Sequence, residues 1–355
     1  MKSEKGNKSE LTRREFIKKS SVSALGLSLL GSIPATLASE TINQTITGKS
    51  KVVLVRNTKV ISPDGIVDND ILSSMLDTAI TNYSGDSPSI FWPKIFSPKD
   101  IIGLKVNTLG LNQISGSSLT NHFSAVTNVI IQSCKEAGIK EENFIIWDRS
   151  NEELTSAGYQ IQNELGKTRI LGNVSRSGGS AIGYSDKEIK VGDKSTYLAK
   201  ILTDMCTCLI NIPLVKDHGI AEFTGALKNH YGTINNAREF HSNNCTNPGI
   251  PEINLIDTIK SKQKLIIADA LLGVFNGGPR WDRKFMWPYG GILVATDPVA
   301  IDTILFNILN DKRKSEGLAP INDSTARHIR LSAEAGLGKN NLNQIDFLEI
   351  NQDRV

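Results

Sequence analysis

The chain has 355 residues, of which 39% are hydrophobic and 22% charged, a composition typical of a folded globular protein and unlike that of a disordered chain or a polytopic membrane protein. Its formal net charge is +3, but residues 1–38 hold seven Lys or Arg and three acidic residues, which leaves 33 basic and 34 acidic side chains in residues 39–355. The body of the chain is therefore close to neutral and shows no electrostatic pattern of a nucleic-acid-binding protein.

The first forty residues resemble a bacterial twin-arginine (Tat) signal peptide. A Lys-rich start leads to Arg13-Arg14 with Phe16 two positions later, followed by a Gly- and Ser-diluted apolar run at 22–31 and small residues ending at Ala38. The run is shorter than the ~20 residues that a membrane-spanning helix needs. We therefore expect a signal peptide over residues 1–38, export by the Tat translocase to the periplasm or another extracytoplasmic site, and no stable membrane span after cleavage. An uncleaved anchor and an ordinary N-terminal helix are the alternatives.

Strand and helix patterns alternate along the rest of the chain. Apolar runs predict strands at 51–56, 101–107, 144–148, 206–215, 265–270, 291–296 and 345–350. Helical spacing of apolar residues predicts helices at 67–82, 122–137, 197–204, 252–262, 298–310 and 325–335. This order predicts an α/β fold with a mainly parallel, doubly wound sheet and helices on both faces. We expect one domain over 39–355, with a small β-rich excursion or subdomain at 160–195.

Four cysteines occur, and their even number in an exported protein suggests disulfides. Their spacing favours another interpretation. Cys134 lies on an apolar helical pattern, where it is expected to be a small core residue. Cys206 and Cys208 are predicted to share one face of a strand, as core thiols or as a metal-binding pair. No four-cysteine cluster or Cys-x-x-Cys motif occurs, which excludes an iron–sulfur ferredoxin module in this chain.

The densest group of chemically useful residues follows the predicted strand 206–215. Lys216, Asp217 and His218 come at its end, and in open α/β sheets ligands bind outside the carboxyl ends of strands. Thr224 is predicted to cap a short helix that carries Lys228 one turn later, which would combine a helix N-terminus with an ammonium group as an anion site. The alternative is a surface loop with solvated charges.

Polar residues also end two neighbouring strands. Lys105 and Asn107 share one face at the end of strand 101–107, and Asp148-Arg149 ends the next strand. Because parallel strands bring such ends to one edge of a sheet, we expect a shared rim.

Downstream residues add structural and functional candidates. Asp269 ends a strand, and Gly277-Gly278 permits a close backbone approach to a ligand or an ordinary turn. Asp297 precedes Pro298 and is predicted to cap a helix. Asp302 lies among apolar residues of that helix and needs a partner, which we expect to be Lys228 or a ligand.

Nucleotide-binding and common hydrolase motifs are absent, including G-x-x-x-x-G-K-[ST], G-x-G-x-x-G after a strand, G-x-S-x-G and H-E-x-x-H. No motif in the sequence therefore identifies a cofactor, and a metal ion is the candidate that remains. His218, His230 and His241 are scattered over one irregular segment and could converge on a metal, and His218, Asp217 and Asp269 are the candidate ligands.

These motifs together resemble the domain of unknown function 362 family, in the family's order and over roughly residues 50–340. The stretches that carry the resemblance are GLKVN (103–107), IPLVKDH (212–218), TGALKN (224–229), IADA (267–270), GGP (277–279) and DPVAID (297–302). The resemblance implies an α/β fold and, as in many members, export by the Tat route. It implies no reaction, because none is established for the family.

Three functions follow from these observations. The first is an exported enzyme in which His218 is the general acid/base and Lys216 and Lys228 hold an anionic or carbonyl-bearing small molecule. Its ligand-binding residues would be Lys105, Asn107, Asn229, Thr224, Gly278 and Asp302, with Asp269 or Asp302 orienting the bases. The second is a metal- or cofactor-binding protein without turnover. The third is a structural or partner-binding protein attached to an exported redox complex.

Overall fold

The structure is a computed structural model that describes residues 48–354. The predicted signal peptide at residues 1–38 lies outside the described residues. From Gly48 onward the chain forms one compact unit.

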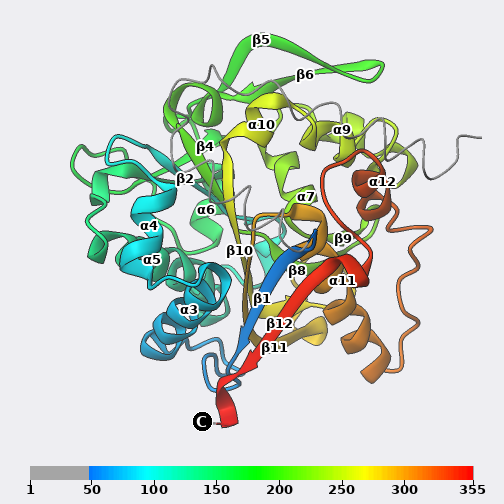
Figure 1. The fold of residues 1–355 in the computed structure, drawn as a ribbon. Coiled ribbons are helices and arrows are strands. Elements are labelled where there is room, and N and C mark those ends of the chain that lie inside the picture. Colours follow the sequence, from blue (N-terminus) through cyan, green and yellow to red (C-terminus); the bar gives the residue numbers. More distant parts are fainter. Residues whose placement is uncertain (1–47, 355) are drawn as a thin grey trace, which may run out of the picture. The chain divides into compact units, whose positions relative to one another are not determined.

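A ten-stranded mixed sheet runs through this unit (Figure 1), in the order β12-β1-β11-β10-β7-β2-β3-β4, with β8 paired to β10 and β9. Its strands are β1 (Ser50–Arg56), β2 (Ile102–Lys105), β3 (Phe144–Ser150), β4 (Arg169–Val174), β7 (Cys208–Asn211), β8 (Leu214–His218), β9 (Glu222–Thr224), β10 (Gln263–Val274), β11 (Met286–Ala295) and β12 (Ile345–Asn351). Most neighbours are parallel, whereas β11 is antiparallel to β1 and β10, and β9 is antiparallel to β8. The predicted α/β fold with a mainly parallel sheet is confirmed.

Helices cover both faces of the sheet. Successive residues of a strand point to opposite faces, and here both sets are apolar and need to be buried. Along β1, Val53 and Val55 belong to one apolar core, and Val52 and Leu54 belong to another. The first core is completed by α3 (Asn69–Ser84), α4 (Pro88–Ile95) and α5 (Asn121–Glu136). The second is completed by α7 (Ala226–Asn229), α9 (Ile250–Asn254), α11 (Pro298–Ser315) and α12 (His328–Glu334), on the other side of the sheet in Figure 1.

Local sequence signals set the ends of the longer helices. The Asp68 side chain accepts hydrogen bonds from the first amides of α3, and this helix ends at Gly85, whose φ of +81° suits glycine. Asp297 caps α11 through the amides of Val299 and Ala300, as predicted.

The strand expected at 206–215 is two strands, β7 and β8. Pro213 has no amide proton to donate, and it stands between them while its carbonyl accepts from Asp269. The helix expected at 197–204 is wrong at its start, because residues 194–199 form a strand and only Ile201–Met205 turn, as a π-helix. The helix expected at 252–262 is interrupted and forms α9 and α10 (Asp257–Lys262).

The segment expected to form an excursion at 160–195 divides between two sheets. Its strand β4 joins the main sheet beside β3. Strand β5 (Tyr184–Val191) pairs with β6 (Lys194–Ala199) in a separate hairpin, seen at the top of Figure 1.

All four cysteines are buried and free. Cys208 packs in the core under α5, whereas Cys206 precedes the strand and packs in the opposite core. The expectation that these two share a strand face is therefore wrong. Burial raises the pKa of each thiol to about 12, so both stay protonated at neutral pH.

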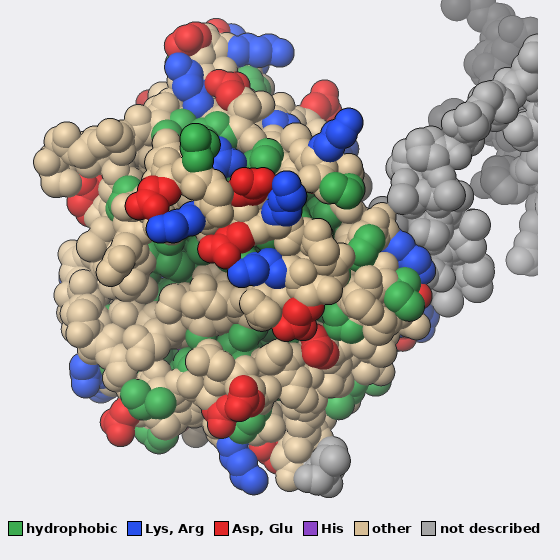
Figure 2. Space-filling view, turned by 90° about the vertical axis from the view of Figure 1, so that its left-hand side faces the viewer, with side chains coloured by type: hydrophobic (Ala, Val, Ile, Leu, Met, Phe, Trp, Pro, Cys, Tyr) green, Lys and Arg blue, Asp and Glu red, His purple; other side chains and the backbone are tan. Residues whose placement is uncertain are grey.

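The surface drawn in Figure 2 carries interspersed acidic and basic side chains, with hydrophobic groups scattered between them. No helix within residues 48–354 combines the length and apolarity needed to cross a membrane.

Candidate functional site

A cavity of about 280 Å³ opens at the carboxyl ends of β2, β3 and β8. This is where ligands bind in open α/β sheets, and its volume suits a small metabolite. Its polar lining residues are Lys105, Asn107, Asp148, Arg149, Glu153, Lys216, His218, Thr224, Lys228, Asn229, Tyr231, Arg238 and His241. Nine of them were predicted from the sequence as site or rim residues, namely Lys105, Asn107, Asp148, Arg149, Lys216, His218, Thr224, Lys228 and Asn229.

Alternation along β8 decides which of its residues face the cavity. Lys216 and His218 are two positions apart and both line it. Asp217 points to the other face, where it accepts a hydrogen bond from the Gly278 amide and lies 3.9 Å from an Arg313 nitrogen. Gly278, predicted to bind a ligand, does not line the cavity; it packs against β8, where a Cβ at this position would meet the Asp217 backbone.

The Lys216 ammonium is buried, and no carboxylate within residues 48–354 pairs with it. Its Nζ donates to the Leu109 carbonyl at 3.0 Å and to Asn107 Oδ1 at 3.3 Å, and it lies 5.6 Å from the Trp281 ring centre. Burial, and to a smaller extent the Lys228 ammonium, lower the pKa of Lys216 to about 7. Near neutral pH this lysine therefore exists both as an ammonium and as a free amine.

His218 has a defined tautomer. Its Nδ1 accepts hydrogen bonds from the amides of Ile220 and Ala221, at 3.1 and 3.2 Å. Because Nδ1 is an acceptor, the single proton of the neutral ring lies on Nε2. Burial, with Lys228 and Lys216 nearby, lowers the pKa of His218 to about 2. His218 is thus placed as a neutral hydrogen-bond donor, and its expected role as a general acid/base stays a prediction.

Lys228 on α7 is the second buried cation of the cavity. Its Nζ lies 4.0 Å from the Tyr231 ring centre, and no hydrogen bond or ion pair joins it to the described residues. Burial lowers the pKa of Lys228 to about 8. Asp302, expected to hold Lys228 or a ligand, instead accepts from the amides of Ala226 at 2.6 Å and Leu227 at 3.0 Å.

Asp302 therefore fixes the start of the short helix that presents Lys228. Burial raises the pKa of its carboxyl to about 7. Thr224 was expected to cap this helix, but it lies in β9 and Gly225 occupies the cap position. Thr224 pairs with Lys216 across β8 and β9, so the two side chains are neighbours on one face. Its buried hydroxyl has no partner among the described residues.

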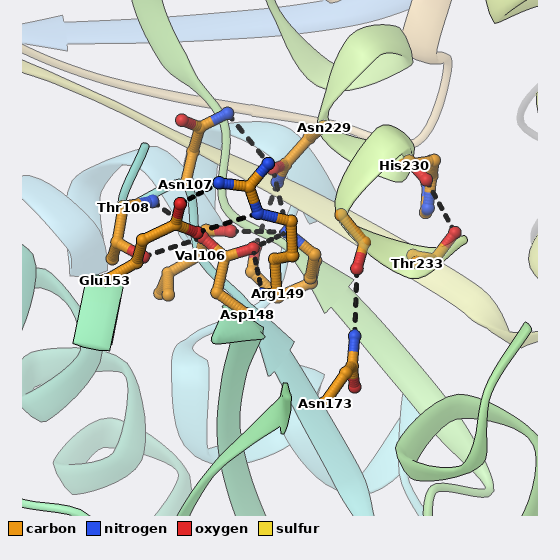
Figure 3. Close-up of polar contacts among 12 residues, drawn as sticks. Val106, Asn107, Thr108, Asp148, Arg149, Glu153, Asn173, Asn229, His230 and Thr233 are labelled. Carbon is orange, nitrogen blue, oxygen red and sulfur yellow. Dashed lines mark hydrogen bonds and ion pairs between the residues drawn. The ribbon is translucent and has the colours of Figure 1, made fainter. Parts of the chain in front are cut away.

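A hydrogen-bond network closes one wall of the cavity (Figure 3). Asp148 accepts from Lys105 Nζ at 2.7 Å and from the amide and hydroxyl of Thr108 at 2.7 and 2.8 Å. Burial raises the pKa of Asp148, but Lys105 and these hydrogen bonds outweigh it and hold the pKa below its usual value. Asn229 Oδ1 accepts hydrogen bonds from Lys105 Nζ and from Asn107 Nδ2, and so links these two side chains.

Four further polar lining residues, Glu153, Tyr231, Arg238 and His241, were not among the predicted site or rim residues. Glu153 lies in the first turn of α6 (Asn151–Ser156) and pairs with Arg149 at the end of β3, as Figure 3 shows. The rings of Tyr231 and His241 meet edge to face, with their centres 5.4 Å apart. The opposite charges of Arg149 and Glu153, four positions apart, are a signal that the sequence contains. The irregular segment that carries Arg238 and His241 gives no comparable signal.

The three residues expected to bind a metal are not brought together. His218 faces the cavity and Asp217 faces away from it. Asp269 on β10 pairs with His122, Oδ2 to Nδ1 at 2.5 Å, in the core under α5. Within residues 48–354, no group of three or more His, Cys, Asp or Glu side chains is placed to hold a metal ion.

Comparison with known proteins identifies a family without an assigned activity. The family described as "Domain of unknown function (DUF362)" matches residues 102–307, which confirms the resemblance seen in the sequence motifs. No curated protein matches the chain. A crystal structure of a Thermotoga maritima protein, a Northeast Structural Genomics Consortium target, is similar with 11% identity and a TM-score of 0.39. The similarity covers 76% of this chain and 60% of that one.

Proposed function

Because this chain belongs to the family of domain of unknown function DUF362, which carries no assigned activity, we propose a function from the site itself. The protein is an enzyme whose cavity binds a small organic anion as substrate. Lys216 and Lys228 hold this ligand, and His218 donates a hydrogen bond to it. The observation that carries the proposal is the burial of two lysines, Lys216 and Lys228, in one cavity where neither pairs with a carboxylate of residues 48–354.

The charges of the cavity support this reading. Lys105 is compensated by Asp148, and Arg149 by Glu153. Lys216 and Lys228 have no such partner among the described residues, and Arg238 adds a further exposed cation at the rim. A buried ammonium costs several kcal/mol of desolvation. An anionic ligand would supply the missing negative charge and also find donors in His218 Nε2 and the Thr224 hydroxyl.

The proposal is tested by calorimetric titration of the protein with pyruvate, oxalate and phosphate. We expect at least one to bind, and Lys228→Met to weaken that binding by more than about tenfold, because a buried charge contact is lost. Lys228→Met should fold with unchanged or higher stability, since it removes an uncompensated buried charge. The matched control is Lys99→Met, at an exposed lysine outside the cavity. Equal affinities in all three proteins would contradict the proposal.

We further propose that the protein is exported by the Tat route, on the evidence of the Arg13-Arg14 pair and the short apolar run after it. Replacing both arginines by lysine should retain the protein in the cytoplasm of a Tat-competent host. Normal export of this variant, measured by fractionation, would contradict the assignment.

A further inference from the structure

Lys216 has the geometry of a nucleophile. Two acceptors, the Leu109 carbonyl and Asn107 Oδ1, take two of its N–H groups. A tetrahedral amine then has one position left, and Lys216 lines the cavity. When the ammonium loses its third proton, the lone pair occupies that position.

The acceptors are held firmly in place. Gly110, next to Leu109, has a φ of +90°, and a Cβ there would meet the Pro279 carbonyl oxygen. The Gly110 carbonyl accepts from the Trp281 amide at 3.1 Å, and Trp281 itself is fully buried. The loop that orients Lys216 is thus packed against the loop at 277–281.

The groups around Lys216 suit a carbonyl compound that also carries an acid group. The Thr224 hydroxyl lies across the strand pair and lacks a partner among the described residues, and His218 presents a proton on Nε2. Both can donate to an oxygen on the reacting carbon. Lys228 is a separate ammonium that can hold a carboxylate.

We propose that Lys216 forms an imine with the ketone of a small 2-oxo acid whose carboxylate is bound by Lys228. This inference rests on the proposed function, because it assigns the substrate class of the same cavity. It makes Lys216 a covalent catalytic residue rather than only a charge.

The chemistry balances without an oxidant or a reductant. The neutral amine of Lys216 attacks the carbonyl carbon, a C–N bond forms, and the carbonyl π electrons move to the oxygen, which receives donors from His218 and Thr224. A proton passes from nitrogen to oxygen to give a carbinolamine. Protonation of its hydroxyl breaks the C–O bond, water leaves, and the nitrogen lone pair completes a protonated imine. One ketone, one amine and one proton give one imine cation and one water.

The proximity of the two lysines supports this assignment. A neighbouring ammonium and a buried site both favour the free amine, and the pKa of Lys216 near 7 provides that amine at neutral pH. Lys228 has a pKa near 8 and lies against the Tyr231 ring, which favours its charged form. The two lysines are thus suited to different roles.

The test is reductive trapping. The full chain is incubated with pyruvate and sodium cyanoborohydride, and the intact mass and the modified peptide are determined by mass spectrometry. We expect one adduct, with the mass of pyruvate less one water plus two hydrogens, on Lys216 of the wild-type protein. Mapping the wild-type protein requires no variant to fold.

Variants separate the roles of the two lysines. Lys216→Arg should abolish the adduct, and Lys228→Arg, which keeps the cation, should retain it on Lys216. An adduct on Lys228, or equal labelling of exposed lysines such as Lys99, would overturn the assignment. If pyruvate and lactate both bind by calorimetry but no adduct forms, the imine is wrong and anion binding stands. If 2-oxo acids, oxalate and phosphate all fail to bind, both proposals are wrong.

Discussion

Lys105 and Asn229 bond to each other in both directions across 124 positions of sequence. Lys105 Nζ donates to Asn229 Oδ1 at 3.1 Å, and Asn229 Nδ2 donates to the Lys105 carbonyl at 3.1 Å. The same amide group also bonds to Asn107 and Asn211. One buried side chain therefore ties α7 to the ends of β2 and β7, and thereby places Lys228 in the cavity wall.

Asn229→Ala should destabilise the fold by about 2–4 kcal/mol, because it leaves several buried polar groups without partners. Urea unfolding would measure this loss. Asn340→Ala, at an exposed asparagine, is the control and should change stability by less than about 0.5 kcal/mol. An unchanged midpoint for Asn229→Ala would show that the network contributes little.

Gly225→Ala should also destabilise the protein, although its backbone lies outside the left-handed region. A Cβ at this position would lie only 2.2 Å from Asp302 Oδ1 and 2.7 Å from Phe223 Cε1, so Asp302 could no longer approach the start of α7. We expect a loss of about 1–3 kcal/mol in unfolding free energy. Gly179→Ala, where the nearest atom would be 3.4 Å away, should be tolerated. Equal stability of the two variants would refute the packing argument.

Anion binding should weaken as pH rises. The pKa of Lys216 is about 7 and that of Lys228 about 8, so both lysines lose their positive charge in a range where exposed lysines remain charged. A bound anion favours the ammonium form, so binding near neutral pH should take up protons. Titration calorimetry in two buffers of different ionisation enthalpy measures that uptake. A constant affinity from about pH 6 to 9 would contradict it.

The stability of the free protein should rise with pH over the same range. Lys216 has a folded pKa of about 7 against 10.5 for the ordinary side chain, so between these values the unfolded state binds more protons. Burial and the Lys228 ammonium lower the pKa of Lys216, and they outweigh the carboxylates of Asp148, Glu153 and Asp217, which raise it. Lys216→Met should flatten the rise in unfolding free energy between about pH 7 and 8, whereas the contribution of Lys228 above about pH 8 remains. An identical pH profile for this variant and the wild type would contradict the prediction.

His218 should remain neutral, with its proton on Nε2, between about pH 4 and 9, because its pKa is lowered to about 2 and Nδ1 accepts two amide hydrogen bonds. Nitrogen-15 NMR of the imidazole distinguishes this tautomer, and His218→Gln assigns the resonance. A signal that titrates near pH 6.5 would exclude the fixed donor role.

The fold was predictable where sequence patterns are local. The apolar run of β1, the Asp297 cap of α11 and the helical spacing of α5 each depend on neighbouring residues, and each is present. The prediction of one long strand at 206–215 failed because the chain continues past Pro213 as a second strand, paired to β9. The helix expected at 197–204 failed because pairing of β6 with β5 overrides its local helical spacing.

The α/β layering, the strand ends that meet at one edge, and the lysines, histidine and amides gathered there follow from local patterns, because alternation and helical spacing are properties of adjacent residues. The partners of these side chains depend on long-range packing. It paired Asp302 with a helix start, Asp269 with His122, and Asp148 with Lys105, and it left Lys216 and Lys228 without a carboxylate among the described residues. Charge compensation depends on which distant side chains come within a few ångströms, and that is fixed only when the sheet and its helices pack together.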